Sequence, residues 1–449
     1  MLEPLSIAEA GQQIRSGALT PIELVERCLK QIDRYDEQVR AWVLVDEKGA
    51  RRTAEELTKE AAAGNFRGPL HGIPLGIKDI IDIAGFPTRA GSPLREKHMA
   101  WADAPLVAAL RSAGAILLGK TVTVEFACFD PPSTRNPWDP LLKHTPGGSS
   151  SGSAAAVAMG MCLGALGTQT GGSLVRPASY CGIAACKPSF GWISMRRREG
   201  IVPVSFHLDH AGPMARTAAD LETILRCLVD RVVWEPATLS APPRLGLLDE
   251  FFMERADQAV RDAAEAALKL LRDAGAQIEA VPLPVDFAEV APMHRRIMAV
   301  DAAAYHREQF AAHRNGYGPK IAALLDEGLA TSGVDYADAL AHKRAFYRQV
   351  APLLKGVDAL IMPATETTAP ATLETTGSPL FQAPWSYAGV PVVSIPCGLA
   401  SDGMPVALQL VGEGFRETPL LQRGPCLLRI AQWCEQRLGF SARPPLWQA

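Results

Sequence analysis

The chain has 449 residues, of which 48% are hydrophobic and 21% are charged, and its formal net charge is −3. This balance is typical of a globular protein with a large core, and it argues against nucleic acid or an anionic membrane as a partner. The nine cysteines include no C-x-x-C pair. Buried free thiols in a reducing cytoplasm are therefore expected, and neither a zinc site nor a disulfide scaffold is indicated.

The N-terminal part of the chain, residues 1–65, is predicted to be helical. SIAE (6–9) and TPIE (20–23) are capping boxes, and the second places proline at the first helical position. The start shows neither the basic nor the apolar stretch of a secretory signal. Residues 68–85, GPLHGIPLGIKDIIDIAG, then alternate short apolar runs with Gly and Pro, as strands and turns do.

Helix and strand patterns alternate through the middle of the chain. An amphipathic helix is predicted over 104–114 and a strand over 115–121. The run SAAAVAMGMCLGALG (153–167) is predicted to be a buried helix, because it is too short to cross a membrane. A strand at 244–250, followed by a helix and a strand over 256–281, predicts parallel strands.

The C-terminal third begins with residues 285–350, which are helical in pattern, rich in charge and without a recognisable motif. We expect them to form an insertion or a cover. Apolar strands follow at 357–365, 390–398 and 405–412. Because strands occur at both ends of the chain, one large sheet flanked by helices in a single domain is predicted.

Two motifs match known patterns in the wrong context. GAILLGKT (114–121) fits the phosphate-binding loop, but a helix precedes it and AILL reads as a strand. GSSSG (148–152) fits the nucleophile elbow, but the residues before it form a loop and no histidine follows position 342. Neither nucleotide binding nor a Ser-His-Asp triad is therefore predicted.

Two Gly-rich turns each present a serine. TPGGSSSGS (145–153) contains Ser149 and GTQTGGS (167–173) contains Ser173. A serine hydroxyl needs a base, and burial can lower the pKa of a lysine by ~3–5 units, which makes lysine a usable base. Lys78 lies in the apolar stretch HGIPLGIKDII and fits that requirement. The alternative is that Lys78 snorkels to the surface or pairs with a carboxylate.

These stretches taken together resemble the pattern of the amidase signature family. PLHGIPLGIKD, GAILLGKT, TRNPWD, PGGSSSGSAAAVA, TGGSLVRPASYCGIAACKPSFG and DHAGPMART follow that pattern in order. GVPVVSIPCGL and GMPVALQLVG follow it near the C-terminus. The resemblance covers residues 5–440, with a weak middle at 285–350.

The resemblance implies an α/β fold, a single large α/β/α sandwich around a mixed sheet. It also implies hydrolysis of a small carboxylic amide to a carboxylate and ammonia or an amine, without a metal or other cofactor. The chain would then be one amidase domain over 1–449, made of N-terminal helices (1–65), a signature core (66–240), a helical insertion or cover (285–350) and the C-terminal part of the core (351–449).

The family pattern also assigns roles to single residues. Ser173 corresponds to the nucleophile, Ser149 to a bridging serine held by a cis peptide bond after Gly148, and Lys78 to the base. The relay would pass a proton from Ser173 through Ser149 to Lys78, and an acyl-enzyme would form. The oxyanion hole would be made by the backbone N–H groups of Thr170, Gly171, Gly172 and Ser173.

The sequence departs from the family pattern at three places. Gln169 stands where Asp is common, Ser151 stands where Gly is common, and Arg176 lies three positions after the nucleophile instead of two. Gln169 and Arg176 resemble a malonamidase-like branch in which such an arginine lies by the substrate. We therefore predict Arg176, Gln169 and Ser150 as substrate-binding residues, with Arg176 binding a substrate carboxylate. The alternative is that Arg176 pairs with a protein carboxylate and braces the loop.

A second function shares the same motifs. The glutaminase-type subunit of a tRNA-dependent amidotransferase carries this signature but acts with partner chains. A binding protein without catalysis is disfavoured, because Lys78, Ser149 and Ser173 are all present. The predicted partner is a small-molecule amide, with no nucleic acid and no membrane, and a homodimer is the oligomer considered. Three segments are expected to line the pocket, at 126–145, 285–350 and 370–388 around Trp385.

Overall fold

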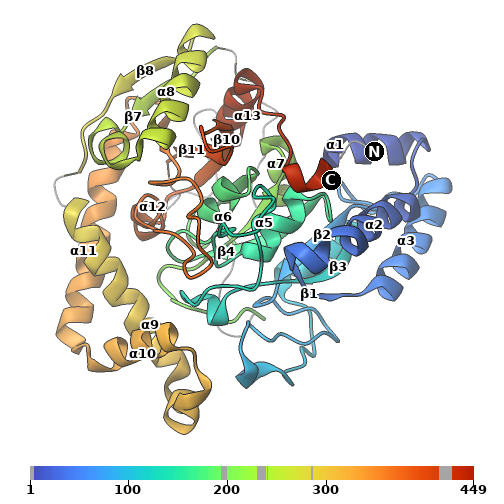
Figure 1. Ribbon diagram of the computed structural model, residues 1–449, viewed down its shortest axis with the longest axis horizontal. Helices are drawn as coiled ribbons and strands as arrows, with labels where there is room; N and C mark the ends of the chain where they lie inside the picture. The colour runs from blue at the N-terminus through green and yellow to red at the C-terminus, as the bar shows by residue number, and fades with distance from the viewer. Residues whose placement is uncertain are drawn as a thin grey trace.

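A computed structural model of the chain describes residues 5–193, 200–229, 239, 241–284, 287–413 and 427–448. Strands from both ends of the sequence form one mixed sheet, with the order β1-β3-β2-β4-β6-β5-β10-β11-β9-β7-β8 (Figure 1). The strands are β1 (Trp42–Val45), β2 (Pro74–Lys78), β3 (Ile116–Thr121), β4 (Gly164–Gln169), β5 (Ala184–Lys187), β6 (His210–Ala215), β7 (Arg244–Leu247), β8 (Gln277–Ala280), β9 (Ala359–Pro363), β10 (Val392–Leu399) and β11 (Pro405–Val411).

Helices pack on both sides of this sheet. Their bounds are α1 (Ile7–Ser16), α2 (Pro21–Val39), α3 (Glu47–Ala62), α4 (Pro105–Ser112), α5 (Ser151–Ala158), α6 (Val175–Tyr180), α7 (Ala218–Leu228), α8 (Gln258–Asp273), α9 (Val290–His313), α10 (Pro319–Ala330), α11 (Gly333–Leu353), α12 (Ala383–Ala388) and α13 (Leu427–Leu438).

Small residues of β4 let helices approach closely from opposite faces. A Cβ added to Gly164 would lie 2.7 Å from Ile224 of α7. A Cβ added to Gly167 would lie 2.7 Å from Leu174 and 2.8 Å from Ser150, which flank α6 and α5. Because positions 164 and 167 point to opposite faces of a strand, α7 covers one face and the starts of α5 and α6 cover the other. The predicted α/β sandwich around a mixed sheet is confirmed.

The central parallel strands of the sheet all end on the same side, and the loops that follow them lie there together. Strand β2 lies between β3 and β4 and is parallel to both. The carboxyl ends of parallel strands meet at the same edge of a sheet, and ligands bind beyond that edge in open α/β sheets. Lys78 ends β2 and Gln169 ends β4, so these residues and the loops after them lie next to each other.

Several local predictions are confirmed and two are wrong. Both N-terminal capping boxes form, and β7, α8 and β8 make the expected parallel unit. The run 153–167 is not a single buried helix, because α5 ends at Ala158 and β4 begins at Gly164. Gly160 adopts a φ of 61° between them, a left-handed conformation that ends the helix. Strand β1 also lies inside the region predicted to be helical.

Residues 285–350 supply a separate group of helices beside the sheet. Helices α10 and α11 both pack on α9, and α9 also contacts α12 (Figure 1). The helices expected in this segment are therefore present. No helix among the described residues is both long enough and apolar enough to span a bilayer.

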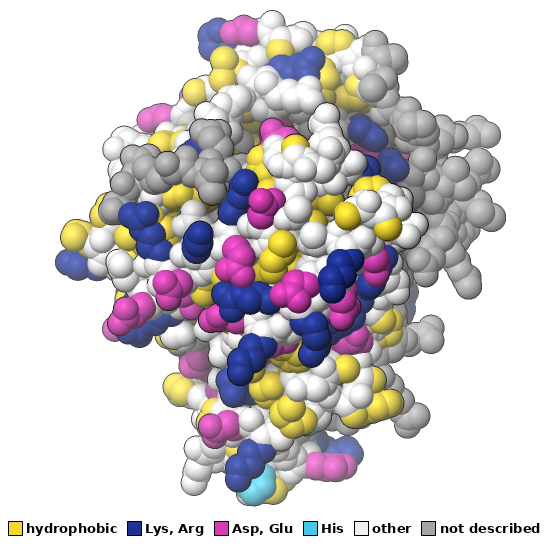
Figure 2. Space-filling view, turned by 90° about the vertical axis from the view of Figure 1, so that its right-hand side faces the viewer, with side chains coloured by type: hydrophobic (Ala, Val, Ile, Leu, Met, Phe, Trp, Pro, Cys, Tyr) yellow, Lys and Arg dark blue, Asp and Glu magenta, His cyan; other side chains and the backbone are white. Residues whose placement is uncertain are grey.

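The face formed by the N-terminal helices has a mixed charge pattern. Lys and Arg side chains alternate there with Asp and Glu (Figure 2). Arg51 pairs with Glu26 and Glu47, and Arg67 pairs with Glu60. These partly exposed pairs contribute little to stability, and they mark α2 and α3 as a solvated face.

Candidate active site

Lys78 is fully buried at the end of β2. Its Nζ lies 2.6 Å from Ser149 Oγ and 2.7 Å from Thr168 Oγ1. No carboxylate among the described residues forms an ion pair with it, and burial lowers the pKa of Lys78 to about 7. The interpretations of Lys78 as a snorkelling side chain or a partner of a carboxylate are therefore wrong. A large share of this amine is neutral near pH 7.

The neighbouring strand β3 contains a second buried lysine in a different environment. Lys120 Nζ lies 2.8 Å from Asp79 Oδ1, and both side chains are inaccessible. Burial lowers the pKa of Lys120 and raises the pKa of Asp79, while their attraction opposes both shifts. Lys120 belongs to the stretch that matched a phosphate loop. That stretch is a buried strand following helix α4, so its backbone N–H groups are not presented to a phosphate.

Ser149 lies in the Gly-rich turn before α5. The peptide bond between Gly148 and Ser149 is cis, as the family pattern implied. The Ser149 side chain is buried and lines a cavity. The next residue, Ser150, donates its backbone N–H to the carbonyl oxygen of Ser173 at 3.3 Å. The two Gly-rich turns are therefore in contact.

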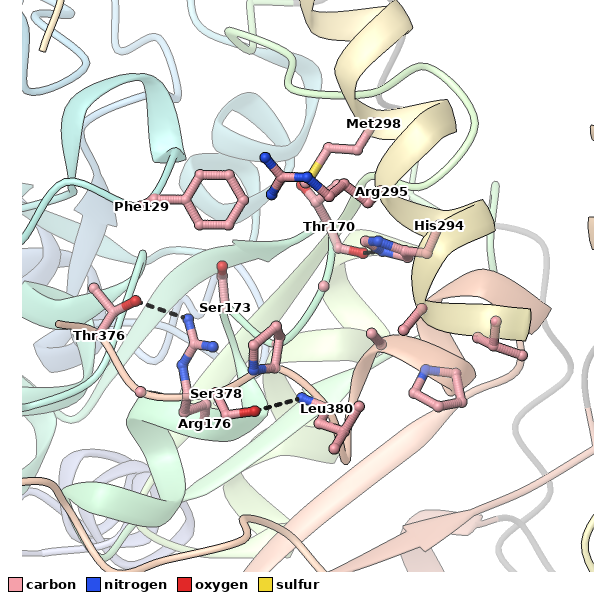
Figure 3. A pocket seen from close by; sticks show the side chains of 18 of the residues that line it. Phe129, Thr170, Ser173, Arg176, His294, Arg295, Met298, Thr376, Ser378 and Leu380 are labelled. Atoms are coloured by element: carbon pink, nitrogen blue, oxygen red, sulfur yellow. Dashed lines mark hydrogen bonds between the residues drawn. The ribbon is translucent and has the colours of Figure 1, made fainter. Parts of the chain in front are cut away.

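Ser173 lies in the loop between β4 and α6 and faces the same cavity, which has a volume of about 310 Å³ (Figure 3). Thr170, Gly171 and Gly172 also line it. Within the described part of the chain, no acceptor takes up the N–H groups of Gly171, Gly172 or Ser173. These groups are available to a bound atom. A Cβ on Gly172 would lie 2.3 Å from Gln382 Oε1, so a side chain there would require the buried Gln382 side chain to shift.

Arg176 extends from α6 into the base of the cavity beside Thr376 (Figure 3). One guanidinium nitrogen donates to Gly148 O at 2.8 Å and to Thr376 Oγ1 at 3.1 Å, and Nε has no partner among the described residues. No carboxylate of the described chain pairs with Arg176, so the alternative of a protein carboxylate partner is wrong. Burial lowers the pKa of Arg176 to about 10.

Gln169 and Ser150, predicted to contact substrate, lie behind the loop instead. Gln169 Oε1 accepts from the backbone N–H groups of Leu174 and Val175 at 2.9 and 3.0 Å. The Ser150 hydroxyl donates to Thr168 O and accepts from Thr168 N, both at 3.2 Å. Both side chains are fully buried and neither lines the cavity. They hold the backbone around Ser173 and do not reach its open side.

Each of the three segments expected to line the pocket contributes residues to it, but sequence reasoning singled out no individual residue of α9. His294, Arg295 and Met298 lie on one helical face and form the wall opposite Arg176 (Figure 3). Their spacing, with Ala291, follows the helical period and is the only signal that could have found them. The rest of the wall is mainly apolar and includes Phe129, Phe251, Phe287, Leu380 and Val290.

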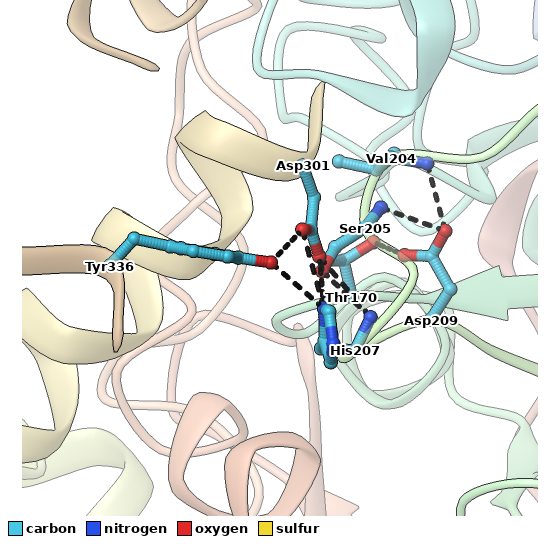
Figure 4. A network of polar contacts seen from close by, with 7 residues as sticks. All are labelled: Thr170, Val204, Ser205, His207, Asp209, Asp301 and Tyr336. Atoms are coloured by element: carbon cyan, nitrogen blue, oxygen red, sulfur yellow. Dashed lines mark hydrogen bonds and ion pairs between the residues drawn. The ribbon is translucent and has the colours of Figure 1, made fainter. Parts of the chain in front are cut away.

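A buried acidic network supports Thr170 from outside the cavity (Figure 4). Thr170 Oγ1 donates to Asp209 Oδ1 at 2.6 Å, and Asp209 Oδ2 accepts from the N–H groups of Val204 and Ser205. Burial raises the pKa of Asp209 to about 6, against the effect of these hydrogen bonds. The Ser205 hydroxyl in turn donates to Asp301 of α9. No three His, Cys, Asp or Glu residues in the described regions are grouped to hold a metal ion.

A family model described as Amidase matches residues 23–421 of this chain. The chain belongs to the amidase family. This amidase is 34% identical to a glutamyl-tRNA(Gln) amidotransferase subunit from Roseiflexus sp. (strain RS-1), over 96% of its own length and 98% of the relative's. It is an enzyme that hydrolyses C–N amide bonds.

Solved structures agree with the family assignment. The amidase superposes on a crystal structure of an amidase with a TM-score of 0.86 and 33% identity, covering 97% of its own chain and 100% of the other. It superposes on the peptide amidase from Stenotrophomonas maltophilia with a TM-score of 0.82 and 30% identity, with 98% of both chains covered.

Proposed function

We propose that this amidase cleaves its substrate through a Ser173–Ser149–Lys78 relay and an acyl-enzyme, without a metal. The observation that carries the proposal is the buried contact of 2.6 Å between Lys78 Nζ and Ser149 Oγ, in a site where no carboxylate among the described residues pairs with the amine. A lysine in this state can accept a proton near neutral pH. Ser173 faces the same cavity as Ser149 and supplies the nucleophile.

The reaction proceeds in two balanced halves. Neutral Lys78 takes the hydroxyl proton of Ser149, Ser149 takes the hydroxyl proton of Ser173, and the Ser173 oxygen bonds to the substrate carbonyl carbon. The relay then returns the proton to the amide nitrogen, the C–N bond breaks, and ammonia or an amine leaves. Water attacks the acyl-enzyme by the same relay, which releases the carboxylate and restores the Ser173 hydroxyl.

The tetrahedral intermediates carry a negative oxygen that needs hydrogen-bond donors. The N–H groups of Gly171, Gly172 and Ser173 have no protein acceptor in the described structure. They border the cavity beside the Ser173 hydroxyl. One such donor is worth about 2.7–4 kcal/mol of transition-state stabilisation.

The lining of the cavity favours an amide with two unlike ends. Arg176 is buried without a carboxylate partner in the described chain, and its guanidinium keeps N–H groups that can bind a substrate carboxylate. The remaining lining is mainly apolar and includes Phe129, Met298 and Leu380, with the Arg295 guanidinium 5.8 Å from the Phe129 ring. We therefore assign a substrate that carries a carboxylate near Arg176 and an apolar group toward the apolar part of the lining.

The alternative function is ammonia supply within a multi-subunit amidotransferase. The similarity to a glutamyl-tRNA(Gln) amidotransferase subunit over nearly the whole length of both chains favours it. Glutamine carries a charged amino group and no apolar end, so the apolar wall of the cavity favours hydrolysis of a separate small amide. Ammonia released from glutamine only when partner subunits are added would establish the alternative.

The experiment combines labelling with product release. The purified protein is treated with a fluorophosphonate serine probe and assayed for ammonia or amine release from a panel of carboxylate-bearing amides. We expect labelling at Ser173, loss of labelling in Ser173→Ala and strongly reduced labelling in Lys78→Met. Unchanged labelling in Lys78→Met, or a label on a different residue, would contradict the relay.

A further inference from the structure

Two peptide groups in the loop before Ser173 are each held by their carbonyl oxygen. His294 Nε2 of α9 lies 2.9 Å from the carbonyl oxygen of Thr170. Ser386 Oγ of α12 donates to the carbonyl oxygen of Gly171 at 2.9 Å. The two donors come from helices far apart in the sequence, and both contact consecutive peptide units of the same loop.

The geometry of the peptide unit connects these contacts to the cavity. In a planar trans peptide the C=O of one residue and the N–H of the next point in opposite directions. The carbonyl of Thr170 shares its plane with the N–H of Gly171, and the carbonyl of Gly171 shares its plane with the N–H of Gly172. Holding each carbonyl therefore fixes the direction of an N–H that has no acceptor in the described chain.

The protonation state of His294 follows from its partner and its burial. A carbonyl oxygen only accepts, so Nε2 carries the proton of the ring. Burial lowers the pKa of His294 to about 4, which keeps the imidazole neutral near pH 7. His294 also lies beside Gly171, since a Cβ on that glycine would be 3.7 Å from His294 Cε1.

The orientation of Ser386 is set by Gln169. The Nε2 of Gln169 donates to Ser386 Oγ at 3.0 Å. Serine has a single hydroxyl proton, and Ser386 donates it to Gly171 O. The group of Gln169 that contacts Ser386 Oγ must therefore itself be a hydrogen-bond donor. An amide supplies that donor and a carboxylate does not. Through its Oε1, Gln169 also binds the backbone of Leu174 and Val175, which lie on the other side of Ser173.

We infer that His294 and Ser386 are positioning residues that orient and polarise the Gly171 and Gly172 N–H groups toward the oxyanion. This inference rests on the proposed Ser173 chemistry. Hydrogen bonds in a chain strengthen one another, so a donor on each carbonyl makes the opposite N–H a stronger donor. The cover helix α9 then contributes to the rate of the reaction as well as to the wall of the cavity.

The test compares variants that keep or remove the donor. His294→Gln retains an N–H near the Nε2 position, and His294→Leu removes it at similar volume. Ser386→Ala removes the second donor with a minimal change in shape. His306→Leu is the matched control, because His306 is equally buried on α9 but contacts Tyr317 and not the loop. Each variant is assayed for kcat, KM and the rate of phosphonylation of Ser173.

We expect His294→Leu to lower kcat about 10–100-fold, less than the loss of a whole oxyanion donor, with KM nearly unchanged. His294→Gln should recover most of that loss, Ser386→Ala should lower kcat about tenfold, and His306→Leu should keep kcat while melting at lower temperature. The phosphonylation rate should fall in parallel with kcat, since that adduct also places an oxygen in the hole.

Two results would overturn the inference. One is a folded His294→Leu enzyme with wild-type kcat, and the other is an equal loss of kcat in His294→Gln and His294→Leu. If His294→Leu does not fold, wild-type kcat in Ser386→Ala overturns the inference instead. A wild-type protein that the probe does not label at Ser173 contradicts the proposed relay itself, so the two failures are distinguishable.

Discussion

The guanidinium of Arg176 donates to the carbonyl oxygen of Gly148 at 2.8 Å, one residue before Ser149. The side chain proposed to anchor the substrate therefore also touches the backbone that carries the bridging serine. A substrate carboxylate bound by Arg176 would lie next to the relay. In the proposed mechanism binding and chemistry share this residue, so its replacement should affect both.

Arg176→Met is expected to discriminate between charged and neutral substrates. Loss of hydrogen bonds to a charged group costs about 1.5–3 kcal/mol, so kcat/KM for a carboxylate-bearing amide should fall about 10–100-fold more than for its neutral isostere. Arg176→Lys keeps the charge but loses the planar, multi-donor guanidinium that also holds Gly148 and Thr376, and should recover only part of the activity. Kinetics on the matched amide pair measure this, and equal losses on both amides would rule out a carboxylate site.

The pH dependence of kcat/KM should report the base. Lys78 is protonated below its pKa of about 7, so activity should fall as the pH drops through that value. The Asp209 carboxylate raises the pKa of Lys78, so Asp209→Asn should move the acid limb to lower pH. Asp220→Asn is the control, because Asp220 is buried at the start of α7 and its pKa is also raised to about 6. A limb that stays in place in Asp209→Asn would argue against Lys78 as the titrating group.

Lys78→Met should be inactive and more stable than the wild type. The folded-state pKa of Lys78 is about 7 and its ordinary value is 10.5, so between these values the native state binds fewer protons than the unfolded state. The stability cost of the buried amine is greatest below pH 7 and disappears as the pH rises to the unfolded value, at about 1.4 kcal/mol per pH unit. Thermal unfolding at several pH values checks this. A variant that melts below the wild type in acid would show that Lys78 stabilises the fold.

The Asp79–Lys120 ion pair should be strongly coupled. Asp79→Asn leaves the ammonium of Lys120 buried without a counter-charge, which costs about 3–5 kcal/mol of unfolding free energy. The double variant Asp79→Asn/Lys120→Met removes both charges and should be more stable than Asp79→Asn alone. Urea denaturation of the four proteins in the cycle gives the coupling energy, and additive losses would mean that the pair contributes nothing as a unit.

The proximity of Lys78 to Ser149, and of Ser149 and Ser173 to one cavity, could be predicted from sequence because these residues lie in short, ordered stretches with few possible structures. Local conformation alone determines these features, which are the Gly-rich turns, the apolar strand that ends in Lys78 and the capping boxes. The same local reasoning was wrong for 153–167, where small apolar residues suit a buried helix and a buried strand equally well. Gly160 is the break between them, and isolated glycines in such a run carry an ambiguous signal.

The individual residues of α9 that line the cavity could not be predicted in this way, although their segment was expected to form a wall. His294 and Arg295 lie in a helix with charged and apolar residues around most of its circumference, so its pattern does not mark a face that lines a cavity. The direction of Gln169 was equally hidden, because it depends on Ser386, which is 217 residues away in the chain. Contacts at such separations follow from packing of the complete fold.

Helix α9 carries both one wall of the cavity and His294, which contacts the carbonyl oxygen of Thr170. A substitution that shifts this helix to admit a bulkier amide would also displace His294. The gain in specificity would then be offset by a lower kcat. Phe129 and Leu380 border the same cavity from outside the regular helices and strands and carry no such second duty. Directed evolution toward new amide substrates should therefore select substitutions at Phe129 and Leu380 first, and substitutions in α9 only later.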